Sequence, residues 1–390
     1  MLRVTSYGLR VLIFFFFLFL PVGWAKHWIV PNSLVNGVLV DYLMPDLWLQ
    51  DIIAIVIIVL TVAQLRVSGF GFLKFLTRNT QTRNAVTHKL IPIFFILISI
   101  IMSPVFLTSV VNFGRLLLAM SVGWIILRNK NLHQPALMGL SGAVVWTTAL
   151  AIGQFINQKT LFGWQFLGEP IYSLGTGGVK KIFLFGQQLV APMATFPHAN
   201  VMGAFGLLTF FILSRQKNKL FIVAKYCSLI LVGLSFSLPV WLITLYLLSR
   251  KFKPAYATLI LSIIGVFSLL ITYYLLPITS FYRRLNLARH SLTIIKNHPF
   301  FGVGWGGFVR HLPPSTFMQP VHNVFLLVLA ELGIIGATGL VLVAREFLKN
   351  FKIRNYILLA TIYLLLATID HYFWTTTQGI YMLWVIVSLL

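Results

Sequence analysis

The chain consists of long apolar runs joined by short polar connections. The apolar segments fall at about residues 8–25, 51–66, 89–104, 107–127, 136–156, 196–214, 220–235, 236–250, 255–277, 322–344, 355–369 and 378–390. A helix needs about 20 residues to cross a membrane, and runs of this kind indicate crossings even though several are short. The pattern predicts an all-α fold: a polytopic transmembrane helical bundle of about 12 spans with a large helical outward loop.

The composition agrees with lipid as the surrounding solvent. Of the 390 residues, 58% are hydrophobic and only 9% are charged, and the mean hydropathy is +0.90. A soluble domain carries far more charge, so the apolar surface must face lipid. We therefore expect residues 1–390 to form a single integral membrane domain in contact with membrane lipid.

The first apolar segment allows two interpretations. Arg3 and Arg10 precede the run Val11–Leu20, and Gly23-Trp24-Ala25 supplies the small residues of a signal-peptide cleavage site. The many spans that follow favour an uncleaved first helix over a signal peptide. Both interpretations place the chain after this segment on the outer side of the membrane.

The net charge of +23 follows the membrane topology. Lysine and arginine gather in short clusters between apolar runs, where positive charge keeps loops on the cytoplasmic side. When the segments alternate from a cytoplasmic N-terminus, both termini lie inside and every inside loop is basic. These loops hold Arg66, Lys74, Arg78, Arg83, Lys89, Arg128, Lys130, Arg215, Lys217, Lys219, Arg250, Lys251, Lys253, Arg345, Lys349, Lys352 and Arg354. Because no soluble basic face results, nucleic acid is not an expected partner.

Three outward segments, at about 26–50, 157–195 and 278–321, are long enough to carry a function. The last breaks the charge rule, because its basic residues face outward. They are Arg283, Arg284, Arg289, Lys296 and Arg310. An anionic ligand is the simplest explanation, so we expect 278–321 to be the main functional loop and 157–195 a second outward loop.

The main loop begins with a helical pattern and continues into a glycine-rich turn. Apolar residues between 284 and 295 are spaced as on one face of a helix, which suggests an amphipathic helix along the membrane surface. Asn297-His298-Pro299 should end it, since the residue before proline is pushed out of helical geometry. The glycines at 302, 304, 306 and 307 either let backbone N–H groups approach an anion or simply turn the chain.

A histidine stands at the start of the next span. His322-Asn323 follows Pro320 and precedes the apolar run Val324–Ala330. The helix dipole there favours the neutral imidazole, which can accept a proton as a general base. The alternative is that His322 caps the helix or lies at the interface. Further along, Glu331 is an acid in an apolar span, and we expect it to pair with a basic residue of another span, such as Arg115 or Lys225.

Two more outward motifs contain histidine. His198 and Asn200 stand at the outer end of the segment 196–214, with Lys180 and Lys181 a short way before them. A binding role and a helix-entry role are both open. Asp370-His371-Tyr372-Phe373-Trp374-Thr375 suits an aromatic belt at the interface, or Asp370 orients an imidazole or meets an outward arginine.

Several signatures of other enzyme classes are absent from the sequence. It contains no Walker-type phosphate loop and no HExxH, and no Asp-x-Asp pair falls outside. Direct use of ATP and metal-assisted chemistry are therefore disfavoured. We expect no cofactor and no metal ligands.

In their order along the chain, these motifs resemble the O-antigen ligase and O-antigen polymerase superfamily. The resemblance rests on Arg284, His298-Pro299-Phe300-Phe301-Gly302-Val303-Gly304, Val321-His322-Asn323 and Glu331-Leu332-Gly333-Ile334-Ile335-Gly336. Thr195-Phe196-Pro197-His198-Ala199-Asn200 is similar to the family's second motif, and Asp370–Thr375 to the closing motif of some members. The set extends over about half of the chain.

The resemblance implies a membrane-embedded, metal-independent, inverting glycosyltransferase of the bacterial inner (cytoplasmic) membrane, with its active side facing the periplasm or exterior. It would take a glycan from an undecaprenyl-diphosphate donor and pass it to a hydroxyl of an acceptor lipid, protein or glycan. The family's loop histidine maps onto His322 as the base, and its loop arginine onto Arg284 as a diphosphate contact. Expected substrate-binding residues are Arg283, Asn323, Gly304, His198, Asn200, Lys180 and Lys181.

The chain departs from the family pattern at two places. Members usually carry arginine where this chain has Ala191, and many show Ser-Arg where it reads Ser237-Leu238. If the first arginine binds diphosphate, one of the outward basic residues must replace it. Besides ligase, the open functions are a repeat-unit polymerase of the same superfamily, a transporter or flippase for lipid-linked glycan with Arg115 and Lys225 along its path, and a catalytically silent homologue.

Overall fold

The computed structural model describes residues 2–67, 84–184, 186–249, 278–314, 316, 318–348 and 353–389 of the chain. These residues are mostly helical, with a few short antiparallel strand pairs. They divide into two compact units. Unit 1 contains Met1–Ile13, Ala25–His133 and Arg283–Leu390, and unit 2 contains Phe14–Trp24 and Gln134–Tyr282.

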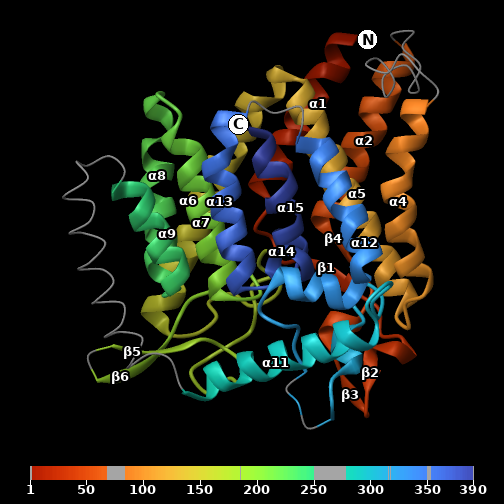
Figure 1. Ribbon diagram of the computed structural model, residues 1–390. Helices are drawn as coiled ribbons and strands as arrows, with labels where there is room; N and C mark the ends of the chain where they lie inside the picture. The colour runs from red at the N-terminus through yellow and green to blue at the C-terminus, as the bar shows by residue number, and fades with distance from the viewer. Residues whose placement is uncertain are drawn as a thin grey trace. The chain divides into compact units, whose positions relative to one another are not determined.

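Unit 1 holds most of the helices. They are the first part of α1 (Leu2–Leu18), then α2 (Leu49–Val67), α4 (Asn84–Ile101), α5 (Phe106–Arg128), α12 (Val324–Leu348), α13 (Ile353–Ile369), α14 (Tyr372–Thr375) and α15 (Thr377–Val385). Short 3₁₀ helices are η1 (Pro31–Ser33), η2 (Asp41–Leu43), η3 (Lys130–Leu132), η5 (Phe308–His311) and η6 (Ile386–Leu389). Helix α4 packs along α12, and α5 packs against α2 and α15 (Figure 1).

Between α1 and α2, unit 1 contains two small strand pairs. Strand β1 (Ala25–His27) pairs antiparallel with β4 (Asp46–Trp48), and β2 (Leu34–Val35) pairs with β3 (Val38–Leu39). After β3, Leu43 in η2 is fully buried, and its carbonyl accepts a hydrogen bond from the Thr108 hydroxyl of α5 at 2.7 Å. This contact fixes η2 against the helices, because a buried carbonyl needs a partner.

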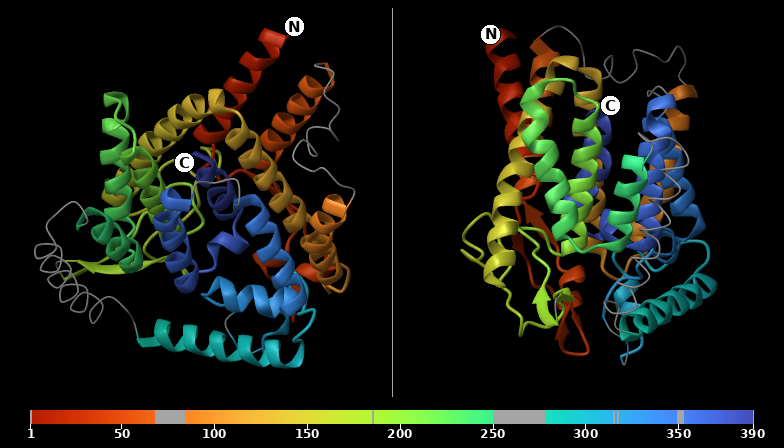
Figure 2. Two further views of the ribbon diagram at one scale, coloured as in Figure 1. Left: turned by 45° about the horizontal axis from the view of Figure 1, so that its top comes forward. Right: turned by 90° about the vertical axis from the view of Figure 1, so that its left-hand side faces the viewer.

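Unit 2 is built around a buried helix. It contains α6 (His133–Asn157), which starts at the unit boundary, the hairpin β5 (Lys181–Leu184) and β6 (Gln187–Val190), and α7 (Ala199–Ser214), η4 (Lys219–Phe221), α8 (Ile222–Leu234) and α9 (Leu238–Ser249). Figure 2 shows α8 beside α7. Both α8 and α9 pack against α7. Every residue of α7 from Val201 to Leu213 is buried, which explains why its sequence is apolar all round.

The predicted apolar segments coincide with helices wherever the structure describes them, with ends shifted by a few residues. The segment 255–277 lies outside the described residues, as do Lys74, Arg78, Arg83, Arg250, Lys251, Lys253, Lys349 and Lys352. The expectation of about 12 spans is not confirmed. Among the described helices, Phe106–Arg128, Lys130–Asn157 and Val324–Phe347 are long and apolar enough to cross a membrane.

Two of the remaining described helices are short. Helices α8 and α9 have 13 and 12 residues. At about 1.5 Å per residue each is about 20 Å long, which is shorter than a hydrocarbon core of about 30 Å.

Helix α12 is broken at Gly333, whose φ of 63° and ψ of −175° are not helical. Figure 1 shows that the parts before and after the break run in different directions. A Cβ atom at this position would collide with the Phe300 carbonyl, and a positive φ is itself unfavourable for other residues. Both conditions make glycine the residue that fits.

The glycine-rich turn fills this break. The Val303 N–H donates to the Ala330 carbonyl at 2.9 Å, and the Gly304 N–H donates to the Glu331 carbonyl at 2.8 Å. These bonds satisfy carbonyl groups that the interrupted helix leaves without their usual partners. The sequence predicted that the turn either binds an anion through its N–H groups or simply turns the chain. Both of these N–H groups bond to α12, so the structural role accounts for them.

Helix α11 (Ile278–Asn297) begins in unit 2 and continues into unit 1. It buries Leu287, Ser291 and Ile294, spaced as on one face of a helix, whereas Leu292 is exposed. The helix ends at Asn297, as the following His298-Pro299 predicts. The amphipathic helix expected in the main loop is therefore present.

Candidate active site

Asn323 determines where α12 starts and what lies beside it. Its side-chain oxygen accepts from the Leu326 N–H at 2.9 Å, which caps the helix. Its side-chain nitrogen donates to the Thr368 carbonyl at 3.1 Å, near the end of α13. One amide thus holds the start of α12 against the end of α13, and His322 is brought to the residues that follow α13.

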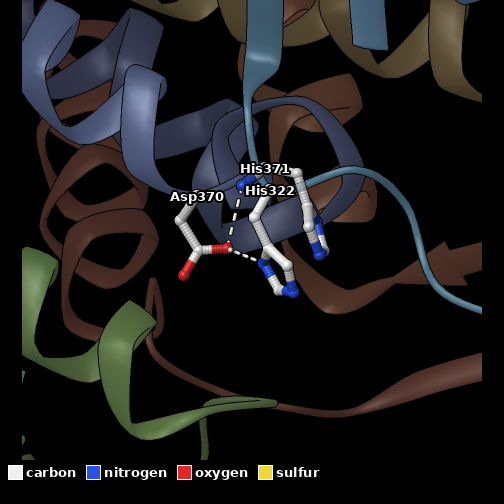
Figure 3. A group of neighbouring side chains, drawn as sticks. All are labelled: His322, Asp370 and His371. Atoms are coloured by element: carbon white, nitrogen blue, oxygen red, sulfur yellow. Dashed lines mark hydrogen bonds and ion pairs between the residues drawn. The ribbon is translucent and has the colours of Figure 1, made fainter. Parts of the chain in front are cut away.

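His322 faces a carboxylate there. Its Nδ1 lies 3.4 Å from Oδ1 of Asp370, and the same oxygen accepts the backbone N–H of His371 at 2.8 Å (Figure 3). The carboxylate is held by its own chain and favours a proton on Nδ1 of His322. That tautomer carries its lone pair on Nε2, the atom a general base needs. The side chains are 20% and 13% exposed, so small molecules can reach them.

His371 forms the second imidazole of the site. Its ring centroid is 5.0 Å from that of His322, with an angle of 36° between the planes. The Nδ1 atom lies 2.7 Å from Oγ1 of Thr375, and this hydroxyl also reaches the His371 carbonyl at 3.3 Å. When the hydroxyl donates its proton to the carbonyl, Oγ1 accepts from Nδ1 of His371, and the lone pair of the ring lies on Nε2.

Tyr42 of η2 closes one side of this group. Its ring meets the His371 ring edge to face, with centroids 5.8 Å apart. Burial, together with the nearby carboxylates of Asp370 and Asp41, raises the pKa of Tyr42 to about 12. The phenol is therefore neutral at any physiological pH and can act only as a neutral hydrogen-bonding group.

Arg284 reaches the same place from α11. Its Nη1 donates to the carbonyl of Ile369 at 3.2 Å, and Ile369 is the residue immediately before Asp370. The predicted arginine and the predicted base thus contact consecutive residues at the end of α13. Arg283, its neighbour, is exposed.

Glu331 corrects one expectation. Its carboxylate accepts from the indole N–H of Trp374 at 2.7 Å, not from the Arg115 or Lys225 side chains that the sequence suggested. Trp374 stacks on Trp305 of the glycine-rich turn, with ring centroids 4.0 Å apart. The acid therefore holds the closing motif to the turn, which the sequence could not show because indole carries no charge.

Arg115 has acidic partners of its own. Its guanidinium contacts Asp46 at 2.6 Å and Asp51 at 3.0 Å, and it is almost fully buried. Two carboxylates surround this one positive charge, which gives the group no net attraction for an anion. Lys225 donates to the Gln216 carbonyl. The contacts of Arg115 and Lys225 therefore give no support to the transporter alternative, in which these residues line a path for an anion.

The second motif lies in unit 2. His198 caps α7 by accepting the Asn200 N–H at 3.1 Å, so the helix-entry role is observed. The Lys180 ammonium donates to the Asn200 side chain at 2.9 Å and to the Ser235 carbonyl at 3.2 Å. Two of the predicted binding residues thus contact each other, while Lys181 at the start of β5 is exposed.

Ala191 lies in the core of this unit. It is fully buried in an apolar cluster with Tyr172, Ile182 and Met193. Its N–H donates to the Lys180 carbonyl at 2.9 Å. The position where relatives are expected to carry arginine is therefore an apolar packing position here, next to the backbone of the lysine.

Sequence reasoning missed Tyr42 and Gln154. No motif marks Tyr42, which approaches His371 only through the fold. Gln154 is a polar residue in an apolar span, which is a usable signal. Its Oε1 accepts the Ala194 N–H at 2.7 Å and its Nε2 donates to Glu169 at 2.8 Å, so it supports the segment before α7.

The comparison with protein families covers the region in which most of these groups lie. Residues 183–341 match the O-antigen ligase family. The superfamily resemblance found in the sequence is thereby confirmed, and the family is one of glycosyltransferase-like enzymes. The match and the long apolar helices together support an integral membrane protein. Searches among curated proteins and among solved structures give no match.

The O-antigen ligase match includes some site residues and excludes others. Inside it lie His198, Asn200, Arg283, Arg284, Gly304, His322 and Asn323. Asp370 and His371 lie beyond its end, and Lys180 and Lys181 lie before its start. The carboxylate beside His322 is therefore a feature of the structure that the match itself does not cover.

Proposed function

We propose that the chain moves a glycan from an undecaprenyl-diphosphate donor to an acceptor hydroxyl on the outer side of the inner membrane. One observation carries the proposal. Arg284 and His322, far apart in the sequence, contact the consecutive residues Ile369 and Asp370. A cation for the diphosphate and a base for the hydroxyl are the two groups that this reaction needs, and the O-antigen ligase match supports the reaction class.

The reaction assigns one role to each side chain. Nε2 of His322 removes the proton from the acceptor hydroxyl, and Asp370 stabilises the resulting imidazolium. The acceptor oxygen attacks the anomeric carbon from the face opposite the diphosphate. The bond between that carbon and the diphosphate oxygen breaks, its electron pair leaves with the lipid diphosphate, and the anomeric centre is inverted.

Arg284 suits the leaving group. A guanidinium has five N–H donors, and the contact with Ile369 engages one of them. The planar group can present two parallel donors to phosphate oxygens, which a lysine cannot do. Its contribution is greatest where negative charge builds up on the departing diphosphate.

For the remaining predicted contacts the proposal is a binding role. Arg283 and Asn323 adjoin Arg284 and His322 in sequence, and Gly304 brings the turn to α12. In unit 2, Lys180 donates to Asn200, and its own carbonyl accepts the Ala191 N–H. We propose Lys180 as the residue that compensates for the arginine absent at Ala191.

A transfer assay with purified protein and a lipid-diphosphate glycan tests the proposal. Wild-type protein should attach glycan to an acceptor hydroxyl, and His322→Ala should not. A single glycan per acceptor indicates a ligase, whereas a ladder of repeat lengths indicates the polymerase of the same superfamily. Undiminished transfer by His322→Ala would remove this histidine from the mechanism, and no transfer by the wild type would favour a silent homologue.

A further inference from the structure

His322, Asp370 and His371 also form a set of metal-ligand atoms. One ring nitrogen from each histidine and one carboxylate oxygen lie within 4.8 Å of one another. Figure 3 shows the two rings beside each other, with the carboxylate next to His322. Two residues of the set come from the segment after α13 and one from the start of α12, so Asn323, which joins these segments, also holds the set together.

The spacing of the first pair fits a tetrahedral ion. With metal–ligand bonds of about 2.0–2.1 Å, two ligands of one tetrahedral ion lie about 3.4 Å apart. Nδ1 of His322 and Oδ1 of Asp370 are 3.4 Å apart. The pair therefore stands at the separation of two ligands without further movement.

The second imidazole has a hydrogen-bond partner of the kind that supports a metal-ligating histidine. With the Thr375 hydroxyl donating to the His371 carbonyl, Oγ1 accepts the ring proton of Nδ1, and the lone pair on Nε2 is turned to the metal. A hydrogen bond of this kind from the other ring nitrogen is the usual support of a metal-ligating histidine. His371 is 6% exposed, and the side chains of the other two residues are more exposed, which leaves the set within reach of an ion from solution.

The donor atoms select the class of ion. Magnesium and calcium take oxygen ligands, whereas imidazole suits zinc, cobalt, nickel and copper. Arg284 lies near the set, because it contacts Ile369, the residue before Asp370. Its positive charge disfavours cations that are bound by charge alone. We propose that His322, Asp370 and His371 bind one transition-metal ion of the Zn²⁺ class, and that this ion switches the site off.

The inhibition follows from the tautomers of His322, and this part rests on the proposed function. An ion on Nδ1 takes the lone pair there, so the ring proton must move to Nε2. Nε2 then carries a hydrogen and cannot remove a proton from the acceptor. The ion also occupies the carboxylate that would stabilise the imidazolium. Metal binding and base catalysis are therefore mutually exclusive at this histidine.

Binding is tested first, without any transfer reaction. Full-length protein, purified without a histidine tag and placed in nanodiscs, is titrated with Co²⁺ while visible absorption is recorded, and with Zn²⁺ by calorimetry. We expect one ion per chain, loss of binding in His371→Ala, and affinity about 10–100-fold weaker in Thr375→Val, which removes the supporting hydroxyl.

The matched control uses a histidine pair for which the described residues supply no carboxylate within ligand distance. The His298 and His311 rings lie 5.9 Å apart, and the double variant His298→Ala, His311→Ala should bind Co²⁺ as the wild type does. Binding that survives in His371→Ala, or that disappears in the control, overturns the site. A melting temperature for each variant identifies any that fails to fold, and Thr375→Val then decides the question.

The second arm measures transfer against added Zn²⁺, with each variant compared with its own metal-free rate. Wild-type transfer should fall and recover on chelation, and His371→Ala should need at least about tenfold more Zn²⁺ for half inhibition. Binding without any wild-type transfer would sink the proposed function and leave the metal site standing. Transfer that is unaffected while Zn²⁺ is bound would overturn the switch.

Discussion

Nδ1 of His322 lies 3.4 Å from Oδ1 of Asp370, although 48 residues separate them in the sequence. The Asn323 bridge to Thr368 produces this approach, because it ties the start of α12 to the end of α13. A carboxylate beside one ring nitrogen directs the lone pair to the other. This geometry supports the proposed role of His322 as the base.

Replacing Asp370 with asparagine should lower transfer by at least about tenfold, because the amide neither selects the tautomer of His322 nor stabilises its charged form. The turnover number should fall while KM for the donor changes little. Steady-state kinetics on the folded variant provide the measurement. Glu346→Gln, an acid elsewhere in the chain, serves as the control, and equal effects of the two substitutions would argue against Asp370 as the orienting group.

Arg284→Lys keeps the positive charge and removes the planar fork. A hydrogen bond to a charged group contributes about 1.5–3 kcal/mol, so transfer should fall by about 10–100-fold. Arg289 lies on the same helix and is exposed, and Arg289→Lys should be nearly neutral. A lysine at 284 that transfers at the wild-type rate would show that charge alone is sufficient there.

Gly333→Ala tests the break in α12. The added Cβ collides with the Phe300 carbonyl at a positive φ, and we expect a loss of more than about 1 kcal/mol in the free energy of unfolding. Gly233 in α8 has open space around its Cβ position and normal helical geometry. Gly233→Ala should leave Tm unchanged or raise it. A Gly333→Ala protein with wild-type Tm would contradict the described turn.

Ala191→Arg is expected to damage the protein, not restore a diphosphate contact. The position is fully buried among apolar side chains, and an unpaired guanidinium there costs several kcal/mol. Thermal unfolding should show a lower Tm, and transfer should not rise. Lys181→Arg, at an exposed strand position nearby, should be tolerated. A gain of transfer in Ala191→Arg would contradict this expectation. It would show that the packing around residue 191 accepts a guanidinium and that the site lacked this charge.

The apolar runs predicted the helices, and the outward motifs predicted the residues around Asp370. Their partners could not be predicted, because they are set by long-range packing. Glu331 was expected to meet a cation, yet it binds the Trp374 indole, a partner that carries no charge. The number of spans stays a prediction, because a helix such as α7 is apolar through burial in protein, which has the same sequence pattern as burial in lipid.

The most direct test of the base is chemical rescue. His322→Ala should reduce transfer by about 100-fold or more, the usual contribution of a general base, and added imidazole should restore part of it. The same imidazole should not restore Arg284→Lys. Rescue of His322→Ala alone is the predicted result. Wild-type rates in His322→Ala without imidazole would contradict the account.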